Sequence, residues 1–485
     1  MLRKDRTAAE FFLKKDYEMY ELTIPIKEES RIPLYEQIYE YIKREIKEKR
    51  IPAGDRLPST RALASQLGIS RSTAQLAYEQ LLSEGYMESR PCKGYYAASL
   101  EGLVELLPVT EQRQKPAGMK EKHYRYDFSY RGIDWDKFPF GIWRKLNREI
   151  LVNDNKDLFA TGDPKGEEEF RRAISSYLHA ARGVNCLSEQ ILVGAGSEYL
   201  LMLLSRMLGS DKCVAMENPT YRQAFRVLCS LGHPVVPVEM DKSGLSVDRL
   251  EESGADIAYV MPSHQYPTGI VMPIKRRMEL LAWASACEGR YVIEDDYDSE
   301  FRYRGKPIPS LQGSDPSDHV IYIGTFSRSI APAIRITYMV LPKSLLNIYE
   351  RDFGFFSSTV SRIDQKLLGR FLAEGCFERH LNRMRSIYKS KHDALLEALE
   401  ALEDEFWISG EHAGVHVLLR SKRGVPESQL IASAAERGVK VYGLSDLFIG
   451  EPLGAYASTV MLGYVNLQPE QIFAGVAELK KAWCR

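Results

Sequence analysis

A short segment of the sequence, YIGTFSRSIAPAIRITYMVLP (Tyr322–Pro342), combines hydroxyl and guanidinium groups at a spacing that suits an anion. Thr325 and Ser327 supply hydroxyls directly after an apolar, strand-like run. Arg335 follows, and an arginine can bind a phosphate through two parallel N–H bonds. We therefore expect these three residues to contribute to a phosphate site.

A second signal for an anion site lies in GAGSEYLLMLL, after the apolar run QILV. Gly194 and Gly196 permit a tight turn, and Ser197 and Glu198 then begin a helix whose first N–H groups face that turn. Such a turn also joins ordinary strands and helices, so its weight comes from the motifs that follow. We expect Ser197 and Glu198 to line the same site as Arg335.

Other side chains suit a flat ring that contains nitrogen. Tyr221 (MENPTYRQAF) can stack on such a ring, although a core tyrosine would give the same pattern. Asp295 (YVIEDDYDSEF) can pair with a ring nitrogen and keep it protonated, and Tyr297 can hydrogen-bond a ring oxygen. A metal site is the alternative for these acids, but no histidine lies near them in the sequence. The loop MPSHQYPTG adds two further candidates, His264 and Gln265.

Buried strands must bring these residues together, because most of them follow apolar runs. Five runs look like strands that are buried on both faces, each followed by a turn or a helix. This alternation predicts an α/β fold with a mainly parallel sheet, whose carboxyl edge usually holds a site. After about Pro342 the pattern becomes more helical and predicts a smaller C-terminal subdomain. The five runs are QILVGAG, KCVAMENP, IAYVMPS, RYVIEDDY and VIYIGTF.

The N-terminal part predicts a separate, small helical unit. PLYEQIYEYIKREIKEK (33–49) has apolar residues at helical spacing. Two shorter helices follow on either side of Gly68, and Ser59 and Ser70 are placed to cap them. Two short helices around a glycine turn are typical of a helix-turn-helix. GYMESRPCKGYYAAS then predicts a two-stranded wing.

The start of the second short helix suits contact with DNA. Hydroxyls and a guanidinium at a helix N-terminus can reach bases and phosphates. A helical protein-interaction module with an ordinary N-cap is the alternative. The side chains at this helix start are Ser70, Arg71, Ser72 and Thr73, and the tip of the wing is Lys93-Gly94.

Composition limits the classes of protein that fit. The 485 residues carry a formal net charge of −1, so overall charge indicates no polyanionic partner. Seven cysteines show no metal-ligand spacing, which favours a reducing compartment and predicts no metal site. No apolar run is long enough to span a bilayer, and the charged N-terminus lacks the pattern of a signal peptide. We expect a soluble, cytoplasmic protein without a membrane partner.

Two family resemblances follow from these motifs. LPSTRALASQLGISRSTAQLAYEQLLSEGY resembles the winged helix of the GntR regulators, and the motifs of the large domain, in this order, resemble fold-type-I pyridoxal-phosphate aminotransferases. GDPKGEEEFRRAISSYLHAARGVNC is similar to the substrate-side segment of that second family. The combination, joined by the linker EGLVELLPVTEQRQKPAGMKEK, resembles the MocR regulators.

The resemblance implies domains, partners and sites. It implies a head-to-tail homodimer that binds a double-stranded DNA operator and a small vitamer or amine effector. The implied DNA contacts are Ser59, Arg61, Ser70, Arg71, Ser72, Thr73, Lys93 and Gly94. The expected parts are an unassigned extension (1–30), the winged helix (31–98), the linker (99–124), a large aminotransferase-like domain (125–345) and a small subdomain (346–485).

Arg328 departs from the aminotransferase pattern. In that family the residue at this place is a lysine that binds pyridoxal phosphate covalently and moves protons. Arginine keeps its proton above pH ~12 and can do neither. The resemblance therefore implies non-covalent binding, without a catalytic residue. The sequence leaves three alternatives open: a site that has drifted after losing its ligand, an engineered replacement of the lysine, or a substitute lysine such as Lys306.

Three functions fit this sequence. The first is a MocR-type transcription regulator without turnover, whose large domain binds pyridoxal phosphate or an amine. The second is a pyridoxal-phosphate aminotransferase with a DNA-binding appendage, and the third is a dimerisation domain with an empty pocket. The loop YGLSDLFIG offers no arginine for a substrate carboxylate, and its Asp446 favours a cationic group instead.

Overall fold

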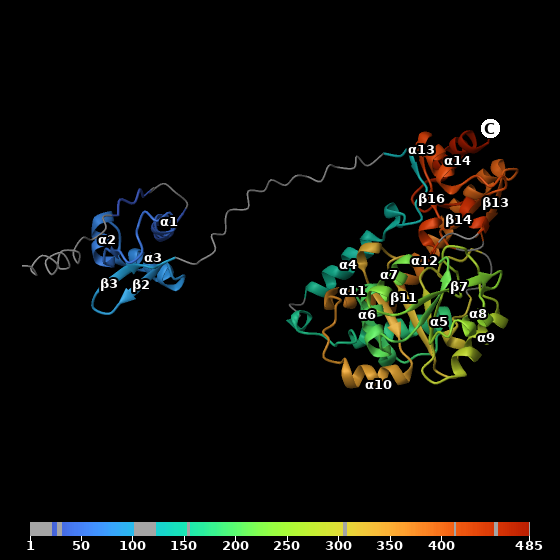
Figure 1. The fold of residues 1–485 in the computed structure, drawn as a ribbon, viewed down its shortest axis with the longest axis horizontal. Helices are drawn as coiled ribbons and strands as arrows, with labels where there is room; N and C mark the ends of the chain where they lie inside the picture. The colour runs from blue at the N-terminus through green and yellow to red at the C-terminus, as the bar shows by residue number, and fades with distance from the viewer. Residues whose placement is uncertain are drawn as a thin grey trace, which may run out of the picture. The chain divides into compact units, whose positions relative to one another are not determined.

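The structure is a computed structural model of the chain, and it comprises two compact units, 1–120 and 121–485 (Figure 1). It describes residues 22–26, 32–100, 123–152, 156–303, 308–411, 414–450 and 454–484. The expected extension (1–30) is described only at 22–26, and the expected linker (99–124) only at its two ends. Lys306 lies outside the described residues.

The N-terminal unit is a winged helix-turn-helix. Three helices pack around an apolar core, and a three-stranded antiparallel sheet in the order β1-β3-β2 forms the wing. The helices are α1 (Leu34–Lys47), α2 (Thr60–Leu67) and α3 (Arg71–Ser83). The strands are β1 (Arg56–Leu57), β2 (Met87–Arg90) and β3 (Gly94–Ala97).

Local sequence explains where these helices begin and end. The Ser59 hydroxyl accepts the Ala62 N–H at 3.1 Å and caps α2, and Gly68 ends α2 in a left-handed conformation. Ser70 caps α3 in the same way. Leu22 and Ile24, which the sequence left unassigned, are buried in this core. Part of the extension therefore belongs to the winged-helix unit.

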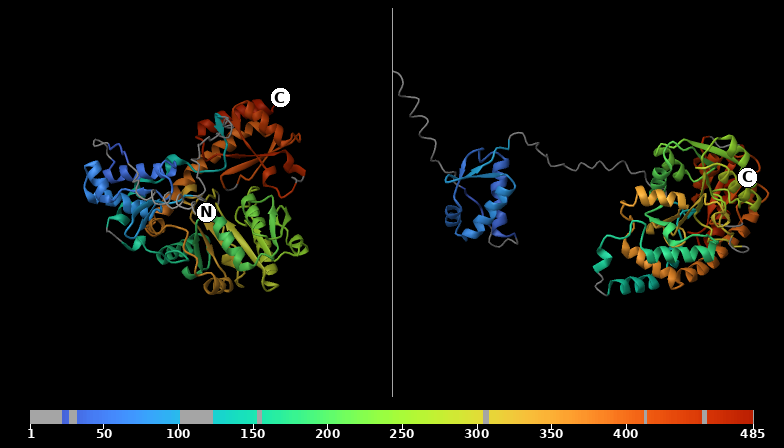
Figure 2. Two further views of the ribbon diagram at one scale, coloured as in Figure 1. Left: turned by 60° about the vertical axis from the view of Figure 1, so that its left-hand side comes forward. Right: turned by 90° about the horizontal axis from the view of Figure 1, so that it is seen from below.

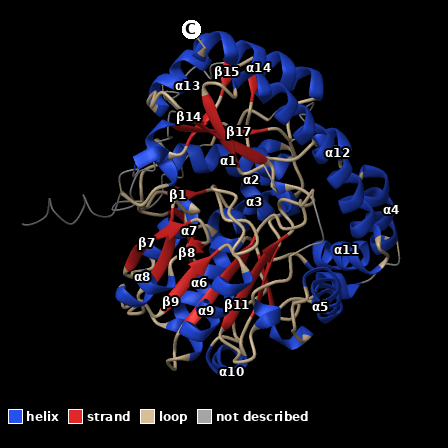
Figure 3. Ribbon diagram, turned by 90° about the vertical axis from the view of Figure 1, so that its right-hand side faces the viewer, coloured by secondary structure: helices blue, strands red, loops and turns tan. Residues whose placement is uncertain are grey.

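The large unit is built on one eight-stranded sheet (Figure 3). The order is β5-β12-β11-β10-β9-β6-β7-β8, and β11, β10, β9, β6 and β7 pair in parallel. β12 is antiparallel to both of its neighbours, a reversal that the apolar runs did not reveal. The strands are β5 (Ile191–Gly194), β6 (Val214–Asn218), β7 (Val235–Asp241), β8 (Gly244–Leu245), β9 (Ile257–Val260), β10 (Tyr291–Asp296), β11 (Val320–Thr325) and β12 (Thr337–Val340).

Helices cover both faces of this sheet, as its strands require. Alternate residues of β11 point to opposite faces: Val320 and Tyr322 pack with one set of helices, and Ile321 and Ile323 with another. The first set is α4 (Phe140–Leu151), α5 (Glu168–Arg182), α8 (Val247–Glu252), α9 (Ile274–Ser285), α11 (Arg362–Ala373) and part of α12 (Cys376–Leu399). The second set is α6 (Ser197–Leu208), α7 (Arg222–Ser230) and α10 (Lys343–Asp352).

The C-terminal elements gather at one end of the large unit (Figure 2). They include a four-stranded antiparallel sheet, β13-β14-β17-β16, so this part is less purely helical than its sequence suggests. β4 (Tyr126–Asp127) pairs with β15 (Val439–Lys440), and Phe128 is buried in the same core. Residues 126–128, which we assigned to the large domain, therefore pack in the small subdomain. The remaining elements are β13 (Phe406–Ser409), β14 (His416–Ser421), β16 (Tyr442–Gly443), β17 (Thr459–Gly463), α13 (Glu427–Glu436) and α14 (Pro469–Trp483).

Candidate ligand-binding cavity and DNA-binding surface

A cavity of about 740 Å³ lies at the carboxyl ends of the parallel strands. Its wall takes residues from the ends of β10 and β11, from the N-termini of α6 and α7, and from the segments 130–132 and 442–447. Nine of the eleven residues that we predicted for a cofactor line it. They are Ser197, Glu198, Tyr221, Asp295, Tyr297, Thr325, Ser327, Arg328 and Arg335.

One end of the cavity is suited to an anion. Arg335 lies in a left-handed conformation (φ 52°), and its Nη2 donates to Glu198 Oε2 at 2.7 Å. Gly196 (φ 100°) precedes α6, and a Cβ atom there would lie 2.9 Å from Arg335 Cζ and closer still to Nη2. Only glycine therefore leaves room for the guanidinium beside the helix N-terminus. Thr325 and Ser327 lie at the same edge, with the Ser327 N–H donating to Thr325 Oγ1 at 3.1 Å.

Asp295 lies at the bottom of the cavity, where β10 ends. Its side chain is buried and accepts a hydrogen bond from the Tyr259 hydroxyl. Burial raises the pKa of Asp295 to about 7, because water no longer stabilises the carboxylate. A positively charged group placed here would favour the ionised form. Asp295 can therefore pair with a cationic ring nitrogen.

Tyrosines form much of the remaining wall, and three of them were not predicted from the sequence. Tyr130, Tyr266 and Tyr442 line the cavity together with the predicted Tyr221 and Tyr297. The Tyr130 ring lies edge-on to Tyr442, with centroids 5.3 Å apart, and 5.9 Å from the Tyr266 ring. Tyr266 directly follows His264 and Gln265 in the predicted loop, and this neighbourhood could have identified it as a candidate. Tyr442 begins the loop YGLSDLFIG, of which only Asp446 was singled out, whereas Tyr130 lies outside every predicted motif.

His264 and Gln265 are not among the described residues that line this cavity. The Gln265 amide donates to the Pro219 carbonyl at 2.8 Å and holds the loop in place. His264 lies behind Tyr297: its Nδ1 is 3.0 Å from both the Tyr297 hydroxyl and Asp298 Oδ2. His264 therefore contacts a residue of the cavity wall, Tyr297, and does not line the cavity itself.

Arg328 reaches the cavity and is tied to a segment that packs with the small subdomain. Its Nη1 donates to the Tyr130 carbonyl at 2.7 Å. Arg131 lies beside the same tyrosine: its Nε donates to the Tyr130 hydroxyl at 3.1 Å, and its guanidinium lies over the ring. Tyr130 thus brings two cationic side chains to one wall.

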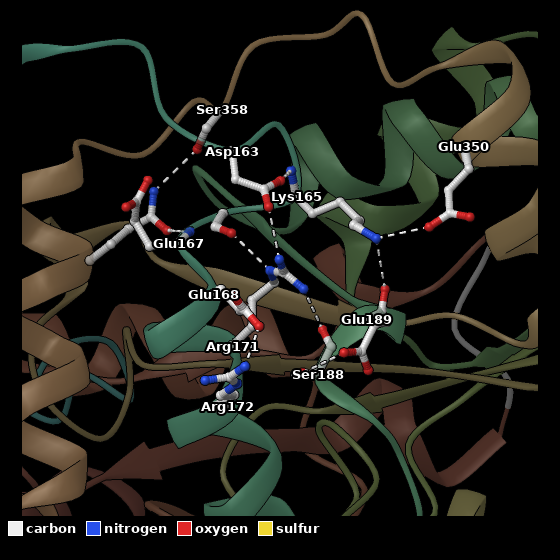
Figure 4. A network of polar contacts seen from close by, with 12 residues as sticks. Asp163, Lys165, Glu167, Glu168, Arg171, Arg172, Ser188, Glu189, Glu350 and Ser358 are labelled. Atoms are coloured by element: carbon white, nitrogen blue, oxygen red, sulfur yellow. Dashed lines mark hydrogen bonds and ion pairs between the residues drawn. The ribbon is translucent and has the colours of Figure 1, made fainter. Parts of the chain in front are cut away.

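The segment GDPKGEEEFRR does not line the cavity; a network of polar contacts holds it to the body of the large unit (Figure 4). Arg171 is buried and donates to the Gly166 and Ser188 carbonyls and to Asp163. Lys165 donates to Glu350 at 2.9 Å. The resemblance of this segment to a substrate-side region therefore corresponds here to packing contacts.

On the winged-helix unit, the side chains that we predicted for DNA are mostly exposed. Arg61, Arg71, Ser72 and Lys93 are exposed, whereas the Ser70 hydroxyl is engaged with Thr73 in capping α3. A further cation at the wing, Arg56, was missed. A Cβ atom at Gly94 would lie 3.5 Å from Arg56 Nε, so the arginine lies along the wing tip. Arg56 lies on β1, which pairs with β3 of the wing. This pairing could not be predicted from the spacing of residues in the sequence.

The described residues contain no group of three or more histidines, cysteines, aspartates or glutamates that could hold a metal ion. None of their helices is both long and apolar enough to cross a membrane.

Comparisons with known proteins agree with both halves of this structure. Residues 34–96 match the family "Bacterial regulatory proteins, gntR family", and residues 133–445 match "Aminotransferase class I and II". Among solved structures, the chain resembles a kynurenine aminotransferase of Pyrococcus horikoshii (TM-score 0.66, 24% identity, 75% of this chain and 91% of that one). It also resembles LysN, the α-aminoadipate aminotransferase of Thermus thermophilus (TM-score 0.63, 25% identity, 74% and 91%).

Similar sequences extend over nearly the whole chain. The HTH-type transcriptional regulator YhdI of Bacillus subtilis is 39% identical over 96% of this chain and 98% of its own. The "Probable rhizopine catabolism regulatory protein MocR" of Rhizobium meliloti is 32% identical, covering 93% and 94%. The pyridoxine biosynthesis regulator PdxR of Corynebacterium glutamicum is 32% identical, covering 85% and 88%. The chain therefore belongs to the MocR-type transcription regulators, in which a GntR helix-turn-helix domain is joined to an aminotransferase class I and II domain.

Proposed function

We propose that this regulator binds pyridoxal phosphate, or a related vitamer or amine, in the 740 Å³ cavity without a covalent bond, and that the bound ligand controls binding to its operator. The observation that carries the proposal is the composition of the wall. Residues for a ring and for a phosphate line one cavity, yet no lysine is among the described lining residues. Arg328 takes the place where the resemblance implies the reactive lysine.

The residues present fit a phosphorylated pyridine ring. Asp295 would hold the ring nitrogen, Tyr221 would stack on the ring and Tyr297 would hydrogen-bond its hydroxyl. The phosphate would lie against Ser197 and Arg335 at the N-terminus of α6, with Thr325 and Ser327 as further donors. The space left by Gly196 supports this assignment, because a side chain there would displace the Arg335 guanidinium.

The same wall argues against turnover. Pyridoxal phosphate would supply an aldehyde that condenses with amines, and transamination would further need a proton-transfer group from the protein. Acid–base groups of this kind contribute about 10²–10⁴-fold, and only when their pKa lies near the working pH. An arginine side chain offers only N–H donors and cannot act as such a group. We therefore infer a regulatory domain rather than an aminotransferase with a DNA-binding appendage.

For DNA, we propose that the winged helix places α3 in a major groove and the wing tip at the adjacent backbone. A head-to-tail homodimer would then read two spaced half-sites. The exposed guanidinium of Arg71 at the start of α3 supports base contact, and the exposed Lys93 supports phosphate contact.

The test uses the full chain and its own upstream DNA. Operator binding is measured by gel shift with and without pyridoxal phosphate, and the cofactor is then removed by dialysis. We expect a ligand-dependent change in operator affinity that dialysis reverses, with no cofactor mass left on the protein after borohydride treatment. Operator affinity that is unchanged at saturating cofactor would contradict effector control. A covalent adduct on the unaltered chain would contradict the non-covalent mode.

A further inference from the structure

Arg328 places a permanent positive charge inside the cavity. A guanidinium has five N–H donors, and one of those of Arg328 goes to the Tyr130 carbonyl. Among the described residues, the structure shows no carboxylate within ion-pair distance of Arg328 and no second hydrogen bond from its guanidinium. The Tyr130 contact fixes the side chain at the wall, and the other donors have no partner in the described protein.

The positive charge of Arg328 affects two tyrosines of the cavity wall that are proposed to bind the ring. Burial raises the pKa of Tyr221 and of Tyr297, and the positive charge of Arg328 opposes the rise at both hydroxyls. Asp295, Tyr221 and Tyr297 are the residues that would hold the ring. Arg328 lines the same cavity as these three residues, so a ring held by them would have a substituent within reach of the Arg328 guanidinium.

The other charges on the wall do not cancel this cation. Arg131, held to the Tyr130 hydroxyl, adds a second positive group to the same wall. Glu198 is already paired with Arg335 at the phosphate end. Asp446 also lines the cavity, but it is exposed on the loop after β16. An amine could pair with Asp446 on that loop, whereas a group that reaches Arg328 meets positive charge.

We propose that Arg328 selects the oxidation state of the bound vitamer: the cavity prefers a phosphorylated pyridine whose substituent facing Arg328 is a carboxylate or an aldehyde, and rejects the aminomethyl form. This inference rests on the proposed function and deepens it. A carboxylate matches the planar guanidinium with two charge-assisted hydrogen bonds, and an aldehyde oxygen accepts one. An ammonium group has only donors and would bring a like charge against Arg328.

Under this proposal, an arginine in place of the lysine gives the cavity a selectivity that a lysine would not give. A lysine at this place would react with an aldehyde and could exchange it for an amine. The arginine cannot react, and it converts the same place into a receptor for an acidic oxygen. The regulator would thus report how much of the vitamer pool is in its oxidised forms.

Calorimetry of the full-length protein tests the preference. The titrants are four 5′-phosphates that differ only in the 4-substituent: 4-pyridoxic acid 5′-phosphate (carboxylate), pyridoxal phosphate (aldehyde), pyridoxine 5′-phosphate (hydroxymethyl) and pyridoxamine 5′-phosphate (aminomethyl). We expect the carboxylate to bind at least tenfold more tightly than the aminomethyl form, with the hydroxymethyl form between them.

Arg328→Met should remove the preference and bring the ratio of the two dissociation constants close to one. Arg206→Met, an exposed substitution on α6 away from the cavity, should keep the ratio. Because each ratio compares ligands on the same protein sample, partial unfolding of a variant cancels from it. Equal or tighter binding of the aminomethyl form, or an unchanged ratio in Arg328→Met, would overturn the inference while leaving the proposed function intact. Failure of all four phosphates to bind would overturn both.

Discussion

At the residue scale, the proposed function depends on the side chain at position 328. Arg328→Lys introduces an amine into the cavity that Asp295 and Tyr297 also line, and these two residues are expected to position the ring. We expect this variant to bind pyridoxal phosphate covalently, because a lysine can lose its proton in such a site and attack an aldehyde. Borohydride reduction followed by intact-mass measurement should show one cofactor per chain. Arg328→Met is the matched control and should show none.

A covalent pyridoxal phosphate adduct on the Arg328→Met variant would show that another lysine reacts with the aldehyde. Failure of Arg328→Lys to bind at all would favour a drifted site over a receptor.

Asp295 is expected to supply the main anchor for the ring nitrogen. Asp295→Asn keeps the shape of the side chain and removes its charge, so the charge-assisted bond to a cationic nitrogen is lost. Hydrogen bonds to charged groups contribute about 1.5–3 kcal/mol, which predicts about a tenfold to hundredfold weaker affinity for pyridoxal phosphate by calorimetry. Glu217→Gln is the control: Glu217 is also a buried carboxyl with a pKa of about 7, but it does not line the cavity. An equal loss in both variants would mean that Asp295 acts only through stability.

Arg71 and Arg61 are expected to contact the operator. Arg71→Ala should cost roughly 1–3 kcal/mol of operator affinity and relax specificity at one base position, because a base contact would be lost. Arg61→Ala should weaken binding to all sequences alike if that residue contacts phosphate. Gel shifts on the upstream region, at one fixed salt concentration, give both quantities. Unchanged affinity in the double variant would contradict this surface as the DNA interface.

At the scale of elements, the turn between β5 and α6 decides whether the anion end of the cavity can form. Gly196→Ala places a methyl group against Arg335 and strains a backbone with φ of 100°. We expect at least a tenfold loss of affinity for each phosphorylated ligand. Gly183→Ala is the control, since Gly183 also has a positive φ (64°) but has no atoms within 4 Å of a Cβ. It should lower the melting temperature and leave ligand affinity unchanged; a similar loss in both variants would show that strain alone is responsible.

The elements also show what a single sequence can reveal. Apolar runs predicted the parallel strands because burial on both faces leaves a continuous hydrophobic pattern, and the residues at their ends gave most of the cavity. The strands β7, β8 and β12 were not among the predicted runs, and the antiparallel direction of β12 could not be predicted because an apolar pattern carries no direction. Tyr130 and Tyr442 were missed because long-range packing alone brings residues 126–128 and 439–443 together.

At the scale of the whole molecule, the candidate cavity and the predicted DNA-binding surface lie in separate units, joined by residues outside the described chain. Under the proposed function, a ligand in the cavity would therefore have to act on the DNA-binding unit across this connection. The Arg328–Tyr130 contact is one place where such an effect could start, because it joins the strand edge of the large sheet to a segment that packs with the small subdomain. A ligand that accepts hydrogen bonds from Arg328 would weaken the hydrogen bond between Arg328 and Tyr130.

Four buried carboxyls lead us to expect that the stability of the protein falls as the pH rises through neutrality. Burial raises the pKa of Glu217, Glu294, Asp295 and Glu300 to about 7 in each case. The folded chain therefore holds these protons more tightly than the unfolded chain, whose carboxyls titrate near pH ~4. Their contribution to stability is complete below that pH and is lost as the pH rises through about 7. Burial lowers the pKa of His416 to about 4, which acts in the opposite direction, but only up to the ordinary histidine pKa of about 6.5.

Between pH 6.5 and 8.5 the carboxyls should therefore dominate, and the melting temperature of the ligand-free protein should fall by several degrees. Scanning calorimetry of the full chain measures the melting temperature across this range. The free energy of unfolding can fall by at most about 1.4 kcal/mol per pH unit for each group. Glu217→Gln, with one titrating carboxyl fewer, should give a shallower slope. Saturation with pyridoxal phosphate should also reduce the fall in melting temperature with pH. A cationic ring nitrogen beside Asp295 would keep that carboxyl ionised throughout the range from pH 6.5 to 8.5. A melting temperature that stays constant or rises from pH 6.5 to 8.5 would mean that water or structural relaxation reaches these carboxyls, and the pairing proposed for Asp295 would lose its electrostatic basis.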